Sequence, residues 1–309
     1  MSGASHLSNI RLQLPATSAN LGPGFDAIGL AMGIYLTVEA RQGSEFKLTA
    51  TGWNVDVCGR LEGNLIVDTY LDVLKQSGRP AVPLEISLQN EIPLGMGCGS
   101  SAAALLAGVA LANHFGEIGM DSAGIVREAS RREGHPDNVA ACWLGGFTAS
   151  AQNQSEVLTA TFTGNPSWRI MLVVPEAGLA TSKARALLPE SYAKADAIHN
   201  VQRTALLVAA FAQRRLDLLR TAMEDRLHQP YRQQACPLLA KLLPISGTHG
   251  IAGIALSGAG PSVLMILEKD ASIQAVEAQV RAVAGPVEMM VTSISRGAHE
   301  LSGGAAGEP

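Results

Sequence analysis

The sequence predicts an α+β protein, because strand-like and helix-like segments are mixed along its 309 residues without the regular β-α-β alternation of a parallel sheet. Apolar and polar residues alternate in IRLQLPAT and IYLTVEARQ, as they do in strands, and long amphipathic helical patterns cover about 195–214 and 216–227. The composition, 47% hydrophobic and 16% charged, is that of an ordinary folded chain. A chain of this length can form one large domain or two smaller ones, and we expect a boundary at about 150–165.

The first two expected strands flank a turn-rich loop, SANLGPGFDAIG, and a third, PLEISLQNEIP, leads into a glycine-rich stretch. A helical pattern runs from Asp121 to Glu133, where Asp121 is suited to cap the helix. GHPDNVAACWLGG is expected to be a loop that enters a short buried segment. In the second half, WRIMLVVP predicts a buried strand before the two long helical patterns. GIALSGAGPSVLMIL then indicates two strands around a glycine turn, followed by a helix near 272–284 and a last strand, VEMMVTSIS.

Charge and cysteine usage exclude several classes of protein. The net charge is −4, and Lys and Arg are scattered, which argues against a nucleic-acid partner or a polybasic membrane patch. The four cysteines lie far apart without a CxxC pair, which favours buried free thiols in a reducing cytosol over a disulfide or a zinc site. No segment resembles a signal peptide, and the most apolar run, 102–112, is shorter than the roughly 20 residues that a membrane span needs. We therefore expect a cytoplasmic protein.

The stretch PLGMGCGSSAAALLAGVALAN places three glycines, Gly95, Gly97 and Gly99, directly before an alanine-rich helix without a polar face. Free N–H groups and a partial positive charge at a helix N-terminus attract phosphate, and glycines let the backbone close around an anion. Ser100 and Ser101 stand at the junction, where a hydroxyl can cap the helix, contact a phosphate or ligate Mg²⁺. The pattern is neither a Walker A loop nor a good GxGxxG. A glycine-rich turn before a core helix is the alternative.

Other stretches place polar side chains next to turn residues, as ligand-binding loops do. These residues are Asn20 and Asp26 in PATSANLGPGFDAIGLAM, His135, Asp137 and Asn138 in EGHPDN, Gly258 and Gly260 in LSGAGPS, Arg185 in TSKARALLP and Arg232 in HQPYR. For each stretch taken singly, a structural turn or an exposed surface arginine is the alternative. The spacing His-x-x-Asn is not a metal-binding pattern, so zinc is not predicted.

Together these stretches resemble the GHMP kinase superfamily and, within it, the homoserine kinases. PLGMGCGSSAA is similar to the superfamily's phosphate loop P-x-x-x-G-L-G-S-S-A, with Cys98 where Leu is usual, and SGAGPS is similar to its third motif. PATSANLGPGFDAIGLAM, GHPDNVA, TSKARALLP and HQPYR resemble homoserine kinase signatures, in the expected order and over nearly the whole chain. The resemblance implies an N-terminal domain like the second domain of ribosomal protein S5, expected at 1–160, and a ferredoxin-like C-terminal domain at 161–309.

The resemblance also implies transfer of the ATP γ-phosphate, with Mg²⁺, to the side-chain hydroxyl of L-homoserine on the route to threonine, by a protein that forms homodimers. The implied nucleotide-binding residues are the phosphate loop and, as a weaker match near the adenine, Asn64: Pro93, Leu94, Gly95, Met96, Gly97, Cys98, Gly99, Ser100, Ser101 and Asn64. The implied homoserine-binding residues are Asn20, Asp26, His135, Asn138, Thr181, Arg185, Arg232 and Gly258. Asp26 suits the ammonium of this zwitterion, and an arginine fork suits its carboxylate.

The implied catalytic residues are Asn138, Asp137 and Ser101, in a reaction that depends on positioning and charge neutralisation more than on a base. We expect Asn138 to orient the hydroxyl and the phosphate, with Asp137 secondary. Family members carry a metal-binding glutamate on the helix before GHPDN. Glu128 fits that position best, with Arg131 and Glu133 also near it, and the hydroxyl of Ser100 is the other expected metal ligand.

Two other functions compete with this one. A mevalonate or sugar kinase of the same superfamily is the first, but neither substrate brings an ammonium and a carboxylate together, as the set of Asp26, Arg185 and Arg232 requires. The second is a nucleotide-binding regulator without catalysis. Such a protein is expected to lack the phosphate-loop serines or the Asp-Asn pair, and both are present.

Overall fold

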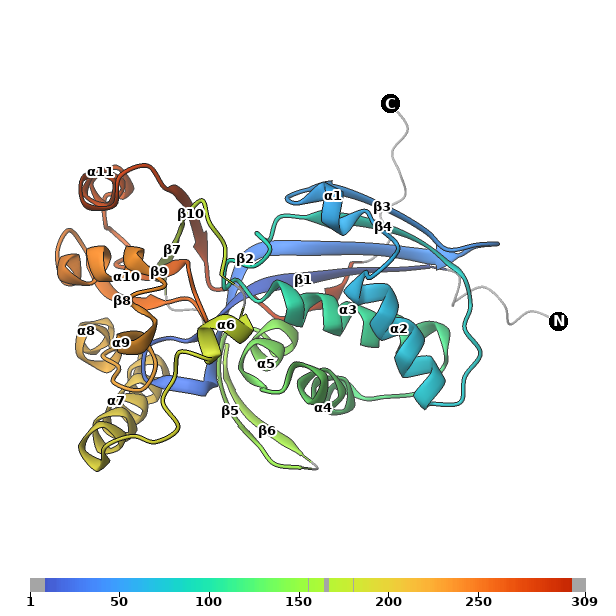
Figure 1. Ribbon diagram of the computed structural model, residues 1–309, viewed down its shortest axis with the longest axis horizontal. Coiled ribbons are helices and arrows are strands. Elements are labelled where there is room, and N and C mark those ends of the chain that lie inside the picture. Colours follow the sequence, from blue (N-terminus) through green and yellow to red (C-terminus); the bar gives the residue numbers. More distant parts are fainter. Residues whose placement is uncertain (1–8, 155, 164–166, 180, 302–309) are drawn as a thin grey trace.

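The structure is a computed structural model that describes residues 9–154, 156–163, 167–179 and 181–301. Its helices and strands are mixed along the chain and build two β-sheets, which confirms the predicted α+β class (Figure 1). The larger sheet contains β1 (Asn9–Asn20), β2 (Gly24–Gln42), β3 (Lys47–Gly52), β4 (Leu84–Asn90), β5 (Phe147–Gln152), β6 (Val157–Phe162) and β11 (His299–Glu300). The smaller sheet contains β7 (Arg169–Val174), β8 (Ile251–Leu256), β9 (Val263–Leu267) and β10 (Glu288–Ser293).

The helices divide between the two sheets. Those of the first half are α1 (Val55–Cys58), α2 (Leu65–Gln76), α3 (Ser100–Phe115), α4 (Ser122–Glu133) and α5 (Asp137–Leu144). Those of the second half are α6 (Thr181–Arg185), α7 (Lys194–Gln213), α8 (Leu219–Ala222), α9 (Gln229–Arg232), α10 (Pro237–Leu242) and α11 (Ile273–Ala284), with 3-10 turns at Leu216–Leu218 and Leu243–Ile245. Among the described residues, no helix is both long enough and apolar enough to cross a membrane.

The larger sheet has the strand order β11-β1-β2-β4-β3, and β5 joins the N-terminal part of β2 and carries β6. Helices α2 to α5 lie on one side of β1 and β2 (Figure 1), and α3 is the most buried of them. Because α3 is covered by the sheet and by α2, α4 and α5, its alanine-rich sequence needs no polar face. The sheet and these helices therefore fix the position of α3, while its first residues, Ser100 and Ser101, stay accessible.

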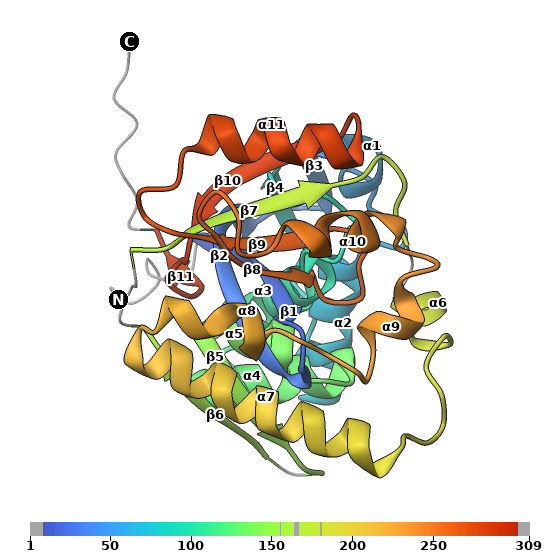
Figure 2. The same ribbon diagram turned by 90° about the vertical axis from the view of Figure 1, so that its left-hand side faces the viewer.

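The smaller sheet is antiparallel in the order β10-β7-β9-β8, with α11 between β9 and β10, which confirms the ferredoxin-like arrangement. Alternation along β7 separates two cores. Met171 and Val173 face α10 and α11, whereas Ile170 and Leu172 face α7, α8 and the core of the larger sheet. Figure 2 shows α11 on one side of this sheet and α7 with α8 on the other.

Three segments differ from the sequence prediction. The GHPDN segment is not only a loop, because α5 begins at Asp137. The predicted helical run 216–227 ends early, since the carboxylate of Asp225 accepts hydrogen bonds from the backbone N–H groups of Leu227, His228 and Gln229 and starts a new turn there. Residues 294–300 pair with the larger sheet through β11 and two isolated bridges, although the predicted division had assigned them to the C-terminal domain.

Candidate active site

The glycine-rich stretch forms the loop between β4 and α3 and surrounds the start of the helix. Gly97 and Gly99 have φ values of 75° and 71°, in the left-handed region, and Gly99 is the N-cap of α3. An added Cβ on Gly97 would lie 2.2 Å from the carbonyl oxygen of Ser257, so no other residue fits there. With a glycine N-cap, the first N–H groups of α3 have no side-chain acceptor, unlike those of α4, where Asp121 caps Gly124 at 2.7 Å as predicted.

The carbonyl groups of this loop are held by the protein. Ser257 Oγ donates to the Gly97 carbonyl at 2.7 Å, and the backbone N–H of Thr17 donates to the Cys98 carbonyl at 3.0 Å. Across a trans peptide the N–H of the next residue points away from the carbonyl, so the N–H groups of Cys98 and Gly99 point away from Ser257 and Thr17, and both residues line a cavity. The loop therefore presents donors to an anion.

A cavity of about 100 Å³ lies in front of these donors. It is lined by residues of six of the predicted stretches: Ala19, Asn20, Phe25, Asp26, Gly97, Cys98, Gly99, Ser100, Ser101, Glu133, His135, Asp137, Asn138, Arg185, Arg232, Gly258 and Ala259. We call it the acceptor cavity. The fold thus brings together segments that are up to 240 residues apart in the sequence, including nearly all of the predicted homoserine-binding residues.

Asp26 and Arg185 form an ion pair across the acceptor cavity. Arg185 donates to both carboxylate oxygens of Asp26, at 2.8 and 2.9 Å, and this pairing raises the pKa of Arg185. Asp26 has a φ of 56°, and its backbone N–H donates to Asn20 Oδ1 at 3.1 Å. Asn20 in turn donates to the carbonyl of Gly258 at 3.0 Å. This hydrogen bond connects the end of β1 to the glycine turn between β8 and β9.

Arg232 forms the buried wall of the same cavity and is only 2% exposed. Its guanidinium lies 3.2 Å from His228 Nδ1, and His228 Nε2 lies 2.7 Å from the carbonyl of Gly22. Since a guanidinium only donates and a carbonyl only accepts, the imidazole is the neutral tautomer with its proton on Nε2. Burial lowers the pKa of His228, which keeps it neutral, and burial together with the charge of Arg185 lowers the pKa of Arg232.

His135, Asp137 and Asn138 lie at the start of α5, next to the phosphate loop. His135 Nδ1 is 2.6 Å from Asp137 Oδ1, and the same oxygen accepts the backbone N–H of Asn138 at 2.6 Å. The Thr17 hydroxyl donates to Asn138 Oδ1 at 2.8 Å and so fixes the orientation of the amide. Burial would lower the pKa of His135, but the hydrogen bond and charge of Asp137 outweigh it, and the pKa is raised.

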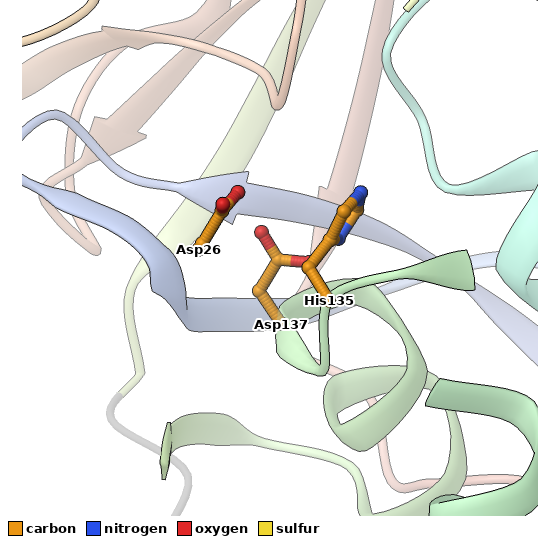
Figure 3. Close-up of side chains that lie close together, drawn as sticks. All are labelled: Asp26, His135 and Asp137. Atoms are coloured by element: carbon orange, nitrogen blue, oxygen red, sulfur yellow. The ribbon is translucent and has the colours of Figure 1, made fainter. Parts of the chain in front are cut away.

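Figure 3 shows that Asp26, His135 and Asp137 approach one another, with one polar atom of each within 4.8 Å of the others. The donor set could hold a cation. However, His135 Nδ1 is already hydrogen-bonded to Asp137, and both oxygens of Asp26 accept from Arg185. The polar atoms of the cluster are therefore engaged with one another and with Arg185.

Glu133, not the predicted Glu128, stands beside the phosphate loop. Ser101 Oγ donates to Glu133 Oε1 at 2.5 Å, at the wall of the acceptor cavity. Glu128 instead pairs with Arg131 and Arg132 at 2.9 and 2.7 Å, and these arginines lower its pKa despite its partial burial. The two glutamates are five positions apart, so they point to different sides of α4. The structure therefore places Glu133, and not Glu128, next to Ser101, and Glu128 as a metal ligand stays a prediction.

A second cavity, of about 280 Å³, lies on the other side of the same two serines. Its lining is mostly apolar: Leu36, Val57, Cys58, Gly63, Asn64, Leu65, Ile66, Leu88, Asn90, Ile92, Leu94, Ser100, Ser101 and Ala104. We call it the nucleotide-side cavity. Asn64 is at its edge, where Oδ1 accepts from the backbone N–H of Ile66 at 3.1 Å and caps α2. Ser100 and Ser101 line both cavities, which therefore meet at the start of α3.

The remaining predicted residues have varied surroundings. Among the described residues of the loop, Pro93, Gly95 and Met96 line neither cavity, whereas Leu94 lines the nucleotide-side cavity. Thr181 begins α6, and its side chain lies outside the described part of the chain. The four cysteines are free, as predicted, and burial raises the pKa of Cys98 to about 12, so its thiol is protonated at neutral pH.

Sequence reasoning missed two residues that orient the site, Thr17 and His228. Both lie inside stretches that were singled out, PATSAN and HQPYR. Their roles depend on contacts with residues that are distant in sequence or buried, Asn138 in the first case and Arg232 in the second. No local pattern marks such contacts.

Comparison with known proteins gives one consistent family. Residues 64–146 match the family model of the GHMP kinases N terminal domain, and residues 207–285 match that of the GHMP kinases C terminal domain. A homoserine kinase of Solibacter usitatus is 48% identical over 84% of this chain and 85% of its own. One of Desulfitobacterium hafniense is 36% identical over 89% of this chain and 93% of its own. The solved structure of a homoserine kinase from Cytophaga hutchinsonii has the same fold, with a TM-score of 0.80 at 24% identity over 97% of this chain and all of that one.

Proposed function

This chain belongs to the GHMP kinase family and, within it, to the homoserine kinases, and from this we propose how its site carries out the reaction. The reaction is transfer of the ATP γ-phosphate to the side-chain hydroxyl of L-homoserine, which gives O-phospho-L-homoserine and ADP. The mevalonate or sugar kinase alternative is not supported, because the curated relatives with high identity are homoserine kinases.

The observation that carries the site assignment is that two cavities of different chemistry meet at Ser100 and Ser101. The larger, mostly apolar nucleotide-side cavity suits an adenine and its ribose, and the charged acceptor cavity suits a zwitterion. The triphosphate would then lie along the loop of Gly97, Cys98 and Gly99 and at the positive end of α3. A γ-phosphate at the two serines faces the acceptor cavity, as in-line transfer requires.

The acceptor would be held by charge. We assign Asp26 to the ammonium of homoserine and Arg185 and Arg232 to its carboxylate, with Asn20 and Gly258 supporting Asp26. The hydroxyl end then points towards Asn138, whose amide oxygen accepts from Thr17 and whose Nδ2 donates to Asp137 Oδ1 at 3.3 Å. Asn138 would thus orient the hydroxyl and the phosphate, while Asp137 supports it and also holds His135.

The residues present fit Mg²⁺ at the edge shared by the two cavities. The hydroxyl of Ser101 and the carboxylate of Glu133 are adjacent hard oxygen ligands of the kind that Mg²⁺ prefers, and Ser100 is next to them. Bound there, the ion would neutralise phosphate charge in a loop that has no lysine. Glu133 and Ser101 are therefore the residues that we assign to it.

Several broader assignments belong to the same proposal. We infer a role in threonine biosynthesis from the homoserine kinases among the relatives. A location in the cytoplasm is supported by the composition and the four free cysteines. A homodimer, which follows from the family resemblance alone, and the expected domain boundary at residues 160 and 161 complete the proposal.

An assay that couples ADP release to a detectable signal tests the function, with L-homoserine, mevalonate and galactose as acceptors. The expected result is Mg²⁺-dependent turnover with L-homoserine and none with the other two. Turnover with mevalonate or galactose in place of homoserine would contradict the substrate. Nucleotide binding without turnover on any acceptor would support a regulator in place of an enzyme.

A further inference from the structure

The acceptor cavity neutralises its own charges when it holds no ligand. The carboxylate of Asp26, which we assign to the substrate ammonium, is bonded through both oxygens to the guanidinium of Arg185, which we assign to the substrate carboxylate. A homoserine molecule bound by both residues competes with this pairing, because both oxygens of Asp26 face the guanidinium. The inference that follows rests on the proposed function, because it uses these two assignments.

The two partners are held in different ways. Asp26 is fixed on β2 by its left-handed backbone and by the hydrogen bond to Asn20, and it faces Asp137 and His135. Arg185 is the last residue of α6, a helix of five residues, and its guanidinium lies 5.3 Å from the ring of Phe25. Since α6 is short and the side chain of Arg185 is 43% exposed, the arginine is the partner that can move.

Arg232 cannot replace Arg185 in this exchange. Its guanidinium lies on the same Phe25 ring at 5.4 Å, but it is buried and already bonded to His228 and to the carbonyls of Ala184 and Gly258. It supplies a fixed positive charge at the base of the cavity. When the ammonium of a ligand binds Asp26, Arg185 is therefore the residue that loses its ion-pair partner.

We propose that the Asp26–Arg185 ion pair makes the acceptor cavity selective for zwitterions by exchange. A ligand with both charges replaces one ion pair with two, because its ammonium takes the place of Arg185 on Asp26 and its carboxylate binds the released guanidinium. A ligand with one charge that binds Asp26 or Arg185 breaks the same ion pair and leaves the other residue without a partner. Unpaired, partly buried charges oppose binding, so amines and carboxylates that share the hydroxyl chain of homoserine are rejected by the cavity itself.

The exchange has a consequence that a simple ammonium site lacks. Asp26→Asn removes the protein carboxylate that competes with a ligand carboxylate for Arg185. A ligand with a carboxylate and no ammonium, 4-hydroxybutyrate, therefore binds the variant more tightly than the wild type. In the reverse case, Arg185→Gln frees Asp26 and improves binding of an amine without a carboxylate, 3-aminopropan-1-ol. For a half-exposed ion pair we expect about a tenfold gain in each matched combination. Homoserine itself loses affinity in both variants.

The experiment measures dissociation constants by calorimetry for the three ligands, with the wild type, Asp26→Asn, Arg185→Gln and the control Arg203→Gln. Arg203, which lies on α7, pairs with Glu224. Its substitution therefore removes an arginine ion pair that does not line the cavity. Asparagine tolerates the left-handed backbone of residue 26, and the circular dichroism spectrum and the melting temperature of each variant check its fold. The expected pattern is a gain for 4-hydroxybutyrate with Asp26→Asn alone and for 3-aminopropan-1-ol with Arg185→Gln alone.

Unchanged or weaker binding of 4-hydroxybutyrate to folded Asp26→Asn would overturn the exchange, because Asp26 would then serve as an ammonium site only. Equal gains with Arg203→Gln would overturn it as well, since the effect would be one of general charge. The proposed function fails separately, through the absence of wild-type turnover with homoserine in the ADP-release assay. The dissociation constants of the one-charge ligands are measured without turnover, so they test the exchange independently of the proposed activity.

Discussion

The two cavities that meet at Ser100 and Ser101 offer their ligands different kinds of contact. In the nucleotide-side cavity, the side chains of Asn64 and Asn90 are engaged with backbone groups of the protein, and the remaining wall is mostly apolar. In the acceptor cavity, charged side chains pair with one another, as Asp26 does with Arg185. The nucleotide-side cavity therefore selects its ligand by shape, and the acceptor cavity selects its ligand by charge. Substitutions should affect the binding of the two substrates separately, except at the wall that the cavities share.

The largest effect is expected at the shared wall. Glu133→Gln removes the carboxylate beside Ser101 and with it the proposed Mg²⁺ ligand, so we expect kcat to fall by about 10²-fold or more. Steady-state kinetics at varied Mg²⁺ concentration measures this. Glu128→Gln is the matched control, because Glu128 pairs with Arg131 and Arg132, and its kcat should stay close to that of the wild type. The opposite ranking of the two variants would restore Glu128 as the metal ligand.

The second largest effect is expected in the phosphate loop. Gly97→Ala puts a methyl group 2.2 Å from the Ser257 carbonyl at a positive φ, so we expect loss of ATP binding and a destabilisation of about 3 kcal/mol. Gly95→Ala has nearly the same φ, 70°, with nothing within 4 Å, and should cost only about 1 kcal/mol. Urea unfolding and nucleotide titration compare the two. Equal losses would show that backbone conformation, not the close approach to the hairpin, decides the outcome.

The nucleotide side can be changed alone. Ala104 on α3 lines the nucleotide-side cavity and does not line the acceptor cavity, so Ala104→Leu should fill space intended for the base. We expect the KM for ATP to rise about tenfold, while the KM for homoserine changes little. Initial rates with each substrate varied in turn provide the measurement. A parallel rise in both KM values would contradict the separation of the two cavities.

The acceptor side can be changed without touching a charge. Thr17→Val deletes the hydroxyl that orients the Asn138 amide but keeps the shape of the side chain, so we expect kcat to fall about tenfold with little change in the KM for ATP. Thr17→Ser restores the hydroxyl and should recover most of the rate. Failure of serine to rescue would indicate a packing effect, since Thr17 is fully buried against Gly99.

The fold was predictable where one strand or helix carries a clear pattern. The buried strand WRIMLVVP corresponds to β7, and the alternating strands at the N-terminus correspond to β1 and β2. The short elements α1 and β3 have no such pattern and were not predicted. The return of the chain to the larger sheet at β11 also left no trace in the sequence, because a two-residue strand pairs through its backbone alone.

The site was predictable as a set of residues but not as a set of contacts. The quoted motifs contain Asp26 and Arg185, yet nothing in the sequence shows that these two residues bond to each other across 159 positions. The choice between Glu128 and Glu133 could not be made from the sequence for a related reason. It depends on where α4 ends and which side of the helix faces α3, and an error of one turn in a sequence match changes the answer.

The smallest expected effect is a pH dependence of stability on the acceptor side. The folded pKa of His135 is raised by Asp137, so this pair stabilises the protein fully below the ordinary histidine pKa of 6.5 and loses that contribution as pH rises through the folded pKa. His135→Asn keeps a donor for Asp137 but carries no charge. The difference in unfolding free energy between wild type and variant should therefore be larger at about pH 5.5 than at about pH 9. Urea unfolding across this range measures it, and the other histidines, shared by both proteins, cancel in the comparison. A difference that grows with pH would mean that the neutral imidazole, and not the cation, is the form that Asp137 holds in the folded protein.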